Sequence, residues 1–239
     1  MTRWTFGRVR FVITLLTFAF VVSSTSASAA VISWATWTAG TTGATTGTAV
    51  GTLPGLGVGV SYLGEMRGFD DALNWLPASS FTGGIVGNAP PSGPAVDNDG
   101  IMLFGASGAT NVVTFSTPVV DPILAIWSLG QPGITARFTF PASQPFSIEG
   151  GGPNNEFGGS AIFVGGACPA NSVCGIEGNG VVRLIGTYSS ITWTNPAFEG
   201  YYAFTIGAPT PVVAPEPVSL LLFGTGLLAA GWQRHRRRP

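Results

Sequence analysis

Hydrophobic and polar residues alternate along much of this chain with a period of two, which is the pattern of half-buried β-strands. Residues 134–140, Ile-Thr-Ala-Arg-Phe-Thr-Phe, show the alternation most clearly. The same pattern, bounded by turn residues, predicts further strands over residues 32–37, 57–63, 101–104, 111–116, 123–129, 161–164, 181–185, 190–194 and 201–206. About ten short strands with turns between them predict an all-β domain, a two-sheet β-sandwich of jelly-roll-like type.

Three stretches of the domain do not follow the strand pattern. Residues 41–51 are almost all Thr, Gly and Ala, and we expect a loop or an exposed edge there. Residues 69–76 carry apolar side chains at helical spacing, but they span at most two turns, so no convincing helix is predicted. Residues 130–133, Gly-Gln-Pro-Gly, predict a tight turn between two strands.

The first thirty residues have the composition of a secretory signal peptide. Three arginines precede an apolar run over residues 11–22, and small residues follow at 27–30. Cleavage is expected after Ala29 or after Ala30. The alternative is an uncleaved N-terminal anchor, but the apolar run is short for a membrane span. The chain is therefore predicted to be exported.

The C-terminal residues 215–239 contain three features in order. Pro215, Glu216 and Pro217 come first, and the prolines stop a helix from extending upstream. Residues 218–232 are apolar and would make about 22 Å of helix, shorter than a typical span. The chain ends in a basic cluster, which would stay in the cytoplasm while the domain faces outward. This cluster comprises Arg234, Arg236, Arg237 and Arg238, with His235 among them.

The tripeptide, the Leu- and Gly-rich helix and the terminal arginines resemble, in this order, the PEP-CTERM sorting signal of Gram-negative bacteria. The resemblance implies processing by exosortase, a membrane-embedded transpeptidase-like enzyme that cuts near the tripeptide. It also implies transient anchoring in the inner membrane by the C-terminal helix, then release to the cell surface or extracellular matrix. A permanent single-pass anchor is the alternative.

The domain organisation follows from these two ends. Residues 1–30 are the signal peptide, 31–208 the ectodomain, 209–214 a Pro-rich stalk and 215–239 the sorting signal. The order of elements in the ectodomain is also similar to that of ectodomains that commonly carry this tail. That group has no settled biochemical activity, so the similarity implies a fold and a destination rather than a reaction.

Charged residues are scarce and unevenly placed. Only 9% of the residues are charged, lysine is absent, and residues 31–208 hold three arginines against ten carboxylates, a net charge of −7. Because a nucleic-acid binder needs a clustered basic face, nucleic acid is excluded as a partner. The single histidine lies in the tail, which excludes histidine-based catalysis and histidine-ligated metals in the domain.

The two cysteines agree with export. Cys168 and Cys174 are separated by five residues, and in an oxidising compartment such a pair closes a short surface loop as a disulfide. Two free thiols are the alternative. A metal site would need more thiols or a histidine, and the domain has neither.

The segment Asp97-Asn98-Asp99-Gly100 is the sharpest polar cluster. Alternating Asp oxygens before a glycine resemble the first part of a calcium loop, which makes Asp97 and Asp99 candidate ligands. The later glutamate of an EF-hand is missing, so further ligands would have to come from elsewhere, with Asp70 and Asp71 as candidates. A plain Asx turn before a strand is the favoured alternative. Calcium is the only cofactor considered.

Glutamates in or beside Gly-rich loops are candidates for catalysis, because two nearby carboxylates can hydrolyse a glycosidic bond. They are Glu149, Glu156 and Glu177, and ordinary solvated loop carboxylates are the favoured interpretation. Glu199, in the turn before the last predicted strand, is expected to hydrogen-bond that turn. No catalytic residue is assigned.

Tryptophan side chains raise the question of sugar binding, because flat aromatic faces stack on pyranose rings. Trp127 and Trp193 lie inside predicted strands and are expected in the core. Trp34, Trp37 and Trp75 are left open between core and surface, with core packing favoured.

Together these observations predict a non-enzymatic, exported surface or matrix protein with a structural or adhesive role linked to exopolysaccharide. The first alternative is a carbohydrate-binding, lectin-like module, assisted by calcium in one version. A hydrolase acting on polysaccharide is a third and weaker alternative.

Overall fold

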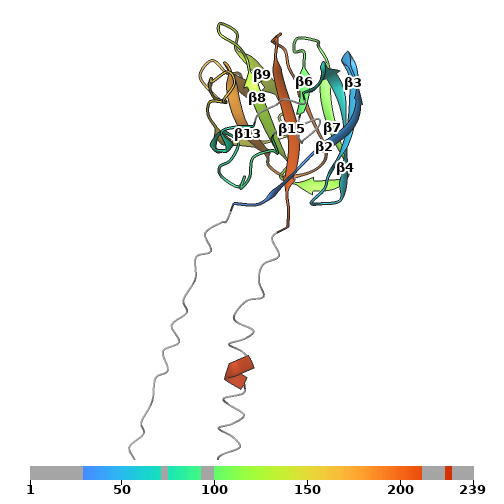
Figure 1. Cartoon of the computed structure of the whole chain (residues 1–239), viewed down its shortest axis with the longest axis vertical. Coiled ribbons are helices and arrows are strands. Elements are labelled where there is room, and N and C mark those ends of the chain that lie inside the picture. The colour runs from blue at the N-terminus through green and yellow to red at the C-terminus, as the bar shows by residue number, and fades with distance from the viewer. Residues whose placement is uncertain (1–28, 71–74, 93–99, 212–223, 228–239) are drawn as a thin grey trace, which may run out of the picture.

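The computed structural model describes residues 29–70, 75–92, 100–211 and 224–227 of the chain, and the fold they form is all-β. Fifteen strands and one short 3₁₀ helix, η1 (Ala78–Ser80), are described. The strands form two sheets that pack face to face as a β-sandwich (Figure 1). Residues 224–227 make one helical turn, and no helix in the described ranges is long and apolar enough to cross a bilayer.

The first sheet has β8 and β15 at its centre. Its neighbouring strands are antiparallel, except that the short β11 runs parallel to β13. In spatial order the strands are β10 (Phe146–Gly151), β13 (Gly178–Leu184), β8 (Ile123–Leu129), β15 (Tyr202–Pro209), β6 (Gly100–Leu103) and β5 (Gly68–Asp70). Two more strands join it: β1 (Ile32–Trp34) pairs with β15, and β11 (Ser160–Ala161) pairs with β13.

The second sheet is antiparallel throughout, with β2 at one edge and β12 at the other. In spatial order its strands are β12 (Ser172–Gly175), β9 (Ala136–Thr139), β14 (Thr187–Thr194), β7 (Thr110–Val120), β4 (Val58–Met66), β3 (Gly43–Leu53) and β2 (Thr36–Thr41). From β6 to β10, and again from β12 to β15, each strand lies in the opposite sheet from the one before it.

The main core lies between the sheets and is rich in aromatic rings. Trp193 stacks on Phe138 and meets Phe204 of the facing sheet edge to face, with ring centroids 5.6 Å and 4.9 Å apart. Alternate residues of strands such as β9 point into this core, which is why the period of two was visible in the sequence.

A second core covers the outer face of the first sheet. Trp75 and Phe81, from the segment that includes η1, are fully buried there with Trp127 of β8. As a result β8 is buried on both faces at all seven positions, as its continuous hydrophobic run requires.

The sequence predicted most strands, and residues 123–129 match β8 to the residue. The predicted strand over residues 32–37 is divided at Ala35, where the chain passes from β1 in one sheet to β2 in the other. The turn at 130–133 is confirmed by the paired hydrogen bonds between Gln131 and Ile134. The sequence missed β10, β12 and the short β5, and of residues 161–164 only Ala161 lies in a strand.

The prediction of a loop or an exposed edge over residues 41–51 was wrong for most of the stretch, although Thr41 lies in the edge strand β2. Most of this stretch belongs to β3, which is flanked by β2 and β4 and is not itself an edge strand. Its glycines allow close packing: a Cβ added at Gly47 would lie 2.4 Å from the Cβ of Met66 in β4. Backbone pairing on both sides holds β3 in place without a hydrophobic pattern. Of the segment 69–76, Phe69 and Asp70 belong to a strand, and 71–74 lie outside the described residues.

The first and last strands of the domain pair with each other. Ile32 of β1 lies opposite Pro209 of β15, and Thr210 N–H donates to the Val31 carbonyl. The last strand therefore continues into the expected stalk, because β1 supplies its partner. Both ends of the domain leave the sandwich at the same end, at the bottom of Figure 1.

Candidate functional site

Three strand ends and one loop meet at the end of the sandwich opposite the termini. β15 begins there at Tyr202, β8 ends there at Leu129, and β13 begins there at Gly178. Tyr202 and Pro209 are seven steps apart along β15, about 23 Å at the usual rise per residue. We call the cluster of side chains on these strand ends and loops the distal rim. Its members are Trp127, Ser128, Phe157, Glu177, Glu199 and Tyr201.

Ser128 and Glu177 are joined across the rim. The Ser128 hydroxyl donates to Oε2 of Glu177 at 2.6 Å, and the Ser128 N–H donates to Oδ1 of the fully buried Asn179 at 2.8 Å. Ser128 and Glu177 both have positive φ, 53° and 52°, a conformation that costs free energy for residues with a Cβ. The surrounding hydrogen bonds hold both residues in this geometry.

The loop that carries Phe157 is fixed to the same network. Asn154 donates through Nδ2 to Oδ1 of Asn179 at 2.9 Å. Oδ1 of Asn154 accepts from the backbone N–H groups of Glu156 and Phe157, at 2.9 Å and 2.6 Å. Because Asn154 and Asn179 are both buried, Phe157 is held at a defined position.

Three aromatic rings pack edge to face at this position. The ring centroids of Trp127 and Phe157 are 5.3 Å apart, those of Trp127 and Tyr201 5.5 Å, and those of Phe157 and Tyr201 5.9 Å. Trp127 is buried at the base, whereas 47% of Phe157 is exposed and Tyr201 is half-buried. The rim therefore presents immobilised aromatic surface to solvent.

Glu199 lies almost fully buried beside this cluster, with 3% of its surface exposed. Its Oε1 accepts from the Tyr201 N–H at 2.7 Å, so the expected hydrogen bond to the turn is confirmed. Burial raises the pKa of Glu199 to about 7; backbone N–H groups oppose this shift, and the nearby charge of Glu177 adds to it. Within the described ranges, Oε2 of Glu199 and Nε1 of Trp127 are buried without a hydrogen-bond partner.

A second buried carboxyl group, that of Glu65, belongs to the core and not to the distal rim. Glu65 is 1% exposed and accepts from the Ser107 hydroxyl at 2.5 Å and, at 3.4 Å, from Asn111 and Tyr202. Burial raises its pKa, and these hydrogen bonds partly offset the shift. Because its oxygens are occupied by side chains of both sheets, this network joins the sheets.

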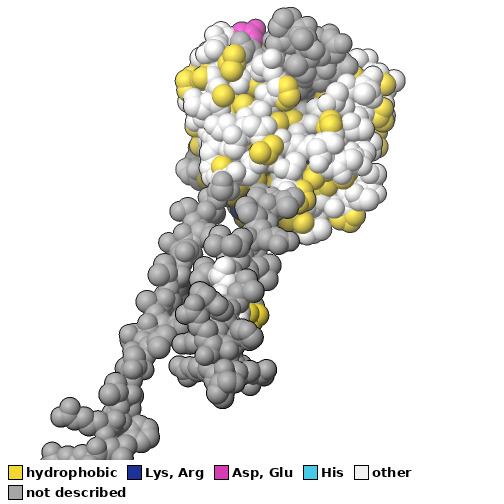
Figure 2. Space-filling model, turned by 60° about the horizontal axis from the view of Figure 1, so that its bottom comes forward, with side chains coloured by type: hydrophobic (Ala, Val, Ile, Leu, Met, Phe, Trp, Pro, Cys, Tyr) yellow, Lys and Arg dark blue, Asp and Glu magenta, His cyan; other side chains and the backbone are white. Residues whose placement is uncertain are grey.

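The end of the sandwich where the termini leave, opposite the distal rim, carries an apolar groove of about 550 Å³. The Arg183–Asp121 ion pair, at 2.5 Å, contributes its polar lining. Figure 2 views the molecule from this end and shows hydrophobic side chains scattered over the surface, several of them near the domain's two ends. The apolar lining includes Leu56, Val58, Val119, Val120, Ala208 and Pro209.

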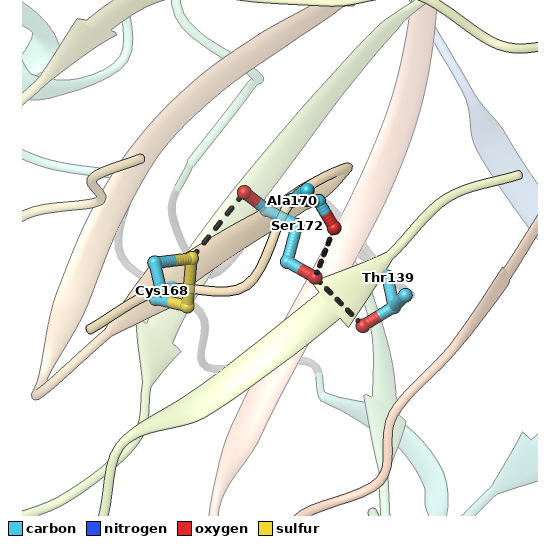
Figure 3. Close-up of a disulfide and its surroundings, with 5 residues drawn as sticks. Thr139, Cys168, Ala170 and Ser172 are labelled. Carbon is cyan, nitrogen blue, oxygen red and sulfur yellow. Dashed lines mark hydrogen bonds between the residues drawn. A yellow bond between two sulfur atoms is a disulfide. The ribbon is translucent and has the colours of Figure 1, made fainter. Parts of the chain in front are cut away.

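The predicted disulfide is confirmed. Cys168 and Cys174 are bonded, with their Cα atoms 5.8 Å apart, and both are buried. Figure 3 shows the bridge beside Ser172, whose hydroxyl lies 2.9 Å from that of Thr139. The bridge thus closes the exposed turn that leads into β12, the edge strand next to β9.

Comparisons with protein-family models, curated proteins and solved structures found no match for this chain.

The structure distributes the candidate glutamates over separate places. Glu149 accepts from the Ile85 N–H at 3.1 Å and from the Ser147 hydroxyl at 2.6 Å, so it fixes a turn of the segment over the first sheet. Glu156 is exposed in the Phe157 loop. Glu177 instead lies near Glu199, a neighbour 22 positions along the chain that no sequence motif indicated.

All five tryptophans considered for sugar binding are buried, with at most 5% of their surface exposed. The core interpretation is confirmed for Trp127 and Trp193 and also holds for Trp34, Trp37 and Trp75. The exposed aromatic surface of the distal rim comes from Phe157 and Tyr201, which sequence reasoning missed because neither stands in a recognisable motif.

Several predicted site residues lie outside the described residues. They are Asp97 and Asp99, the tripeptide Pro215, Glu216 and Pro217, and the basic cluster Arg234, Arg236, Arg237 and Arg238. In the part of the chain that the structure describes, no three His, Cys, Asp or Glu side chains come together as a metal site.

Proposed function

We propose that this chain is an exported Gram-negative surface protein that exosortase sorts through the C-terminal PEP-CTERM signal. In this proposal it acts at the cell surface or in the extracellular matrix, in a structural or adhesive role linked to exopolysaccharide, and is not an enzyme. The features of the two chain ends in the sequence carry the sorting part of the proposal, and the structural observation that supports it is the antiparallel pairing of β1 with β15. This pairing brings the N-terminal and C-terminal ends of the domain to one end of the sandwich.

A domain held at that end turns its distal rim away from the membrane. While the C-terminal helix is in the inner membrane, the rim is the part of the domain best placed to meet a partner. The disulfide supports an oxidising compartment. The alternation of successive strands between the sheets supports the finer fold class, a jelly-roll-like sandwich.

The test is the cellular distribution of the full chain in a host with an exosortase and in the same host without it. We expect the wild-type protein to leave the inner membrane only in the first host. Replacing Glu216 by Ala should retain it in the inner membrane. Glu156→Gln, which removes one carboxylate from the domain, is the control and should be released like the wild type. Release that is independent of both exosortase and Glu216 would overturn the proposal.

The alternative function, a carbohydrate-binding module, is favoured by a specific observation. The distal rim combines exposed aromatic surface with a carboxylate, which are the two kinds of group that sugar recognition uses. The two candidate functions differ in whether the distal rim binds glycan directly.

A further inference from the structure

The solvent-facing part of the distal rim has the chemistry of a sugar-binding surface. Phe157 offers the largest exposed ring surface there, and the half-buried Tyr201 packs against it. A pyranose ring has an apolar C–H face that packs on aromatic rings, and its hydroxyls are hydrogen-bond donors that a carboxylate accepts. Glu177 provides such a carboxylate, half-buried and next to the loop that carries Phe157.

The contacts behind this surface fix it before any ligand arrives. One Glu177 oxygen accepts from Ser128, which orients the carboxylate and leaves its second oxygen for a ligand. Asn179 donates through Nδ2 to the carbonyl of Glu177 at 3.0 Å and also accepts from Asn154, which holds the Phe157 loop. A site whose side chains are already ordered loses little conformational entropy on binding.

Two buried polar atoms lie behind the solvent-facing part of the rim. Nε1 of Trp127 is a donor and Oε2 of Glu199 is an acceptor, and both lack a partner among the residues described. Trp127 and Glu199 are each more than nine-tenths buried, and both adjoin Tyr201. Because both atoms are buried, a sugar at the surface does not contact them, and Trp127 and Glu199 act on the site through Tyr201, which each of them contacts.

Charge narrows the class of sugar. Residues 31–208 carry a net charge of −7, and Glu177 and Glu199 lie together in the rim. Arg67 contacts the same turn, but it donates to the carbonyl of Gly200. A uronic-acid or sulfated polymer would be repelled by the domain, whereas an uncharged polymer would not.

We propose that the distal rim binds a neutral polysaccharide, with a pyranose ring stacked on Phe157 beside Tyr201 and one of its hydroxyls donating to Glu177. Trp127, Ser128 and Glu199 position these groups from behind. The inference deepens the alternative function, the carbohydrate-binding module, and it rests on the proposed export for the view that the ligand is an extracellular polymer.

The experiment measures binding of the purified full chain, in detergent, by affinity electrophoresis. The neutral probes are dextran, mixed-linkage β-glucan and galactomannan, and alginate is the acidic probe. We expect retardation by at least one neutral polymer and none by alginate. Phe157→Ala and Glu177→Gln should each weaken binding about tenfold, the loss expected when a stacking contact or a charge-assisted hydrogen bond is removed.

Matched controls separate the site from general effects. Leu63→Ala removes a half-exposed apolar side chain from the other sheet, and Glu156→Gln removes a carboxylate from the exposed loop. Both should bind like the wild type. If Phe157→Ala fails to fold, Phe157→Leu keeps the apolar volume while removing the flat ring. It should fold and bind about as weakly as expected for Phe157→Ala.

Two results would overturn the inference: no retardation by any neutral polymer, or equal weakening in the control and rim variants. Failure of the proposed function is distinguishable from either. If exosortase-dependent release holds while no polymer binds, only the rim inference fails. If a neutral polymer binds through Phe157 and Glu177 while release ignores the tail, only the sorting proposal fails.

Discussion

Ser128 and Glu177 lie 49 positions apart in the chain and are joined by a 2.6 Å hydrogen bond, while both adopt a left-handed backbone conformation. Ser128 is the next-to-last residue of β8 and Glu177 directly precedes β13, so the bond joins the end of one strand to the beginning of its neighbour. Ser128 and Glu177 are neighbours in space, and their unfavourable backbone angles are stabilised by the hydrogen bond between them and by the hydrogen bonds that each makes with Asn179. We therefore expect removal of the Ser128 hydroxyl alone to destabilise the distal rim.

Replacing Ser128 tests this dependence. Ser128→Ala removes the hydrogen bond and keeps the unfavourable φ, so the free energy of unfolding should fall by about 1.5–3 kcal/mol. Ser128→Gly also removes the bond but relieves the left-handed strain, so it should be about 1 kcal/mol more stable than Ser128→Ala. Urea unfolding of the three proteins measures both differences. A Gly variant less stable than the Ala variant would contradict the argument.

The pH dependence of stability follows from Glu199. Burial raises its pKa from the ordinary 4.5 to about 7, so between these values the folded protein binds a proton that the unfolded chain does not. Proton binding by Glu199 therefore stabilises the folded protein in full below pH 4.5, and this contribution to the free energy of unfolding is lost as the pH rises to about 7. Glu199→Gln stays uncharged, so its melting temperature should depend less on pH and exceed that of the wild type at pH 8.

The control for this comparison is Glu156→Gln, which removes a carboxylate from an exposed loop. Glu65 also has a raised pKa through burial, and it remains in the wild type and in both variants. The difference between wild type and Glu199→Gln therefore isolates Glu199. A wild-type melting temperature that rises between pH 5 and pH 7 relative to that variant would show that the buried carboxyl group is not protonated in the fold.

The sequence predicted most strands that carry a clear hydrophobic pattern and missed several that do not, including the buried β12. β8 is buried at every position and β9 alternates, so hydrophobicity alone identified both. β3 is built mostly from Thr, Gly and Ala, and it forms a strand because it pairs with β2 on one side and β4 on the other, which a local sequence pattern does not show. The disulfide was predictable because two cysteines allow one pairing.

The distal rim could not be predicted because its members come from separate segments. Glu177 and Glu199 become neighbours when β13 and β15 both pair with β8. The loop that brings Phe157 to Trp127 is held by contacts between distant residues, such as the Asn154–Asn179 hydrogen bond. Each of these residues looks like an ordinary loop or turn residue in the sequence. The candidate site is thus a product of strand order, which the hydrophobic pattern leaves open.

The contribution of the disulfide can be predicted from the length of the loop it closes. Cys168 and Cys174 are six positions apart. Closing so short a loop lowers the conformational entropy of the unfolded chain, which raises the free energy of unfolding by about 2 kcal/mol. Replacing both cysteines by alanine should lower the free energy of unfolding by that amount, measured from urea transitions. Reducing the wild-type protein should give the same loss, and adding reductant to the double variant should change nothing. A double variant as stable as the oxidised wild type would contradict the prediction.

The end of the folded domain can be located by truncation. Gly207, Ala208 and Pro209 pair with the three residues of β1, and Ala208 is buried. A chain that stops after Pro211 keeps these pairs, so its unfolding transition should equal that of the full chain. A chain that stops after Ile206 loses them and leaves Ile32 and Trp34 without their neighbouring strand, so it should lose about 3 kcal/mol or more. Both chains lack the sorting signal, so their difference reports on the strand alone. Equal unfolding transitions of the two chains would show that the pairing of the first and last strands does not stabilise the domain. The proposed display of the distal rim, which depends on that pairing, would then lose its structural support.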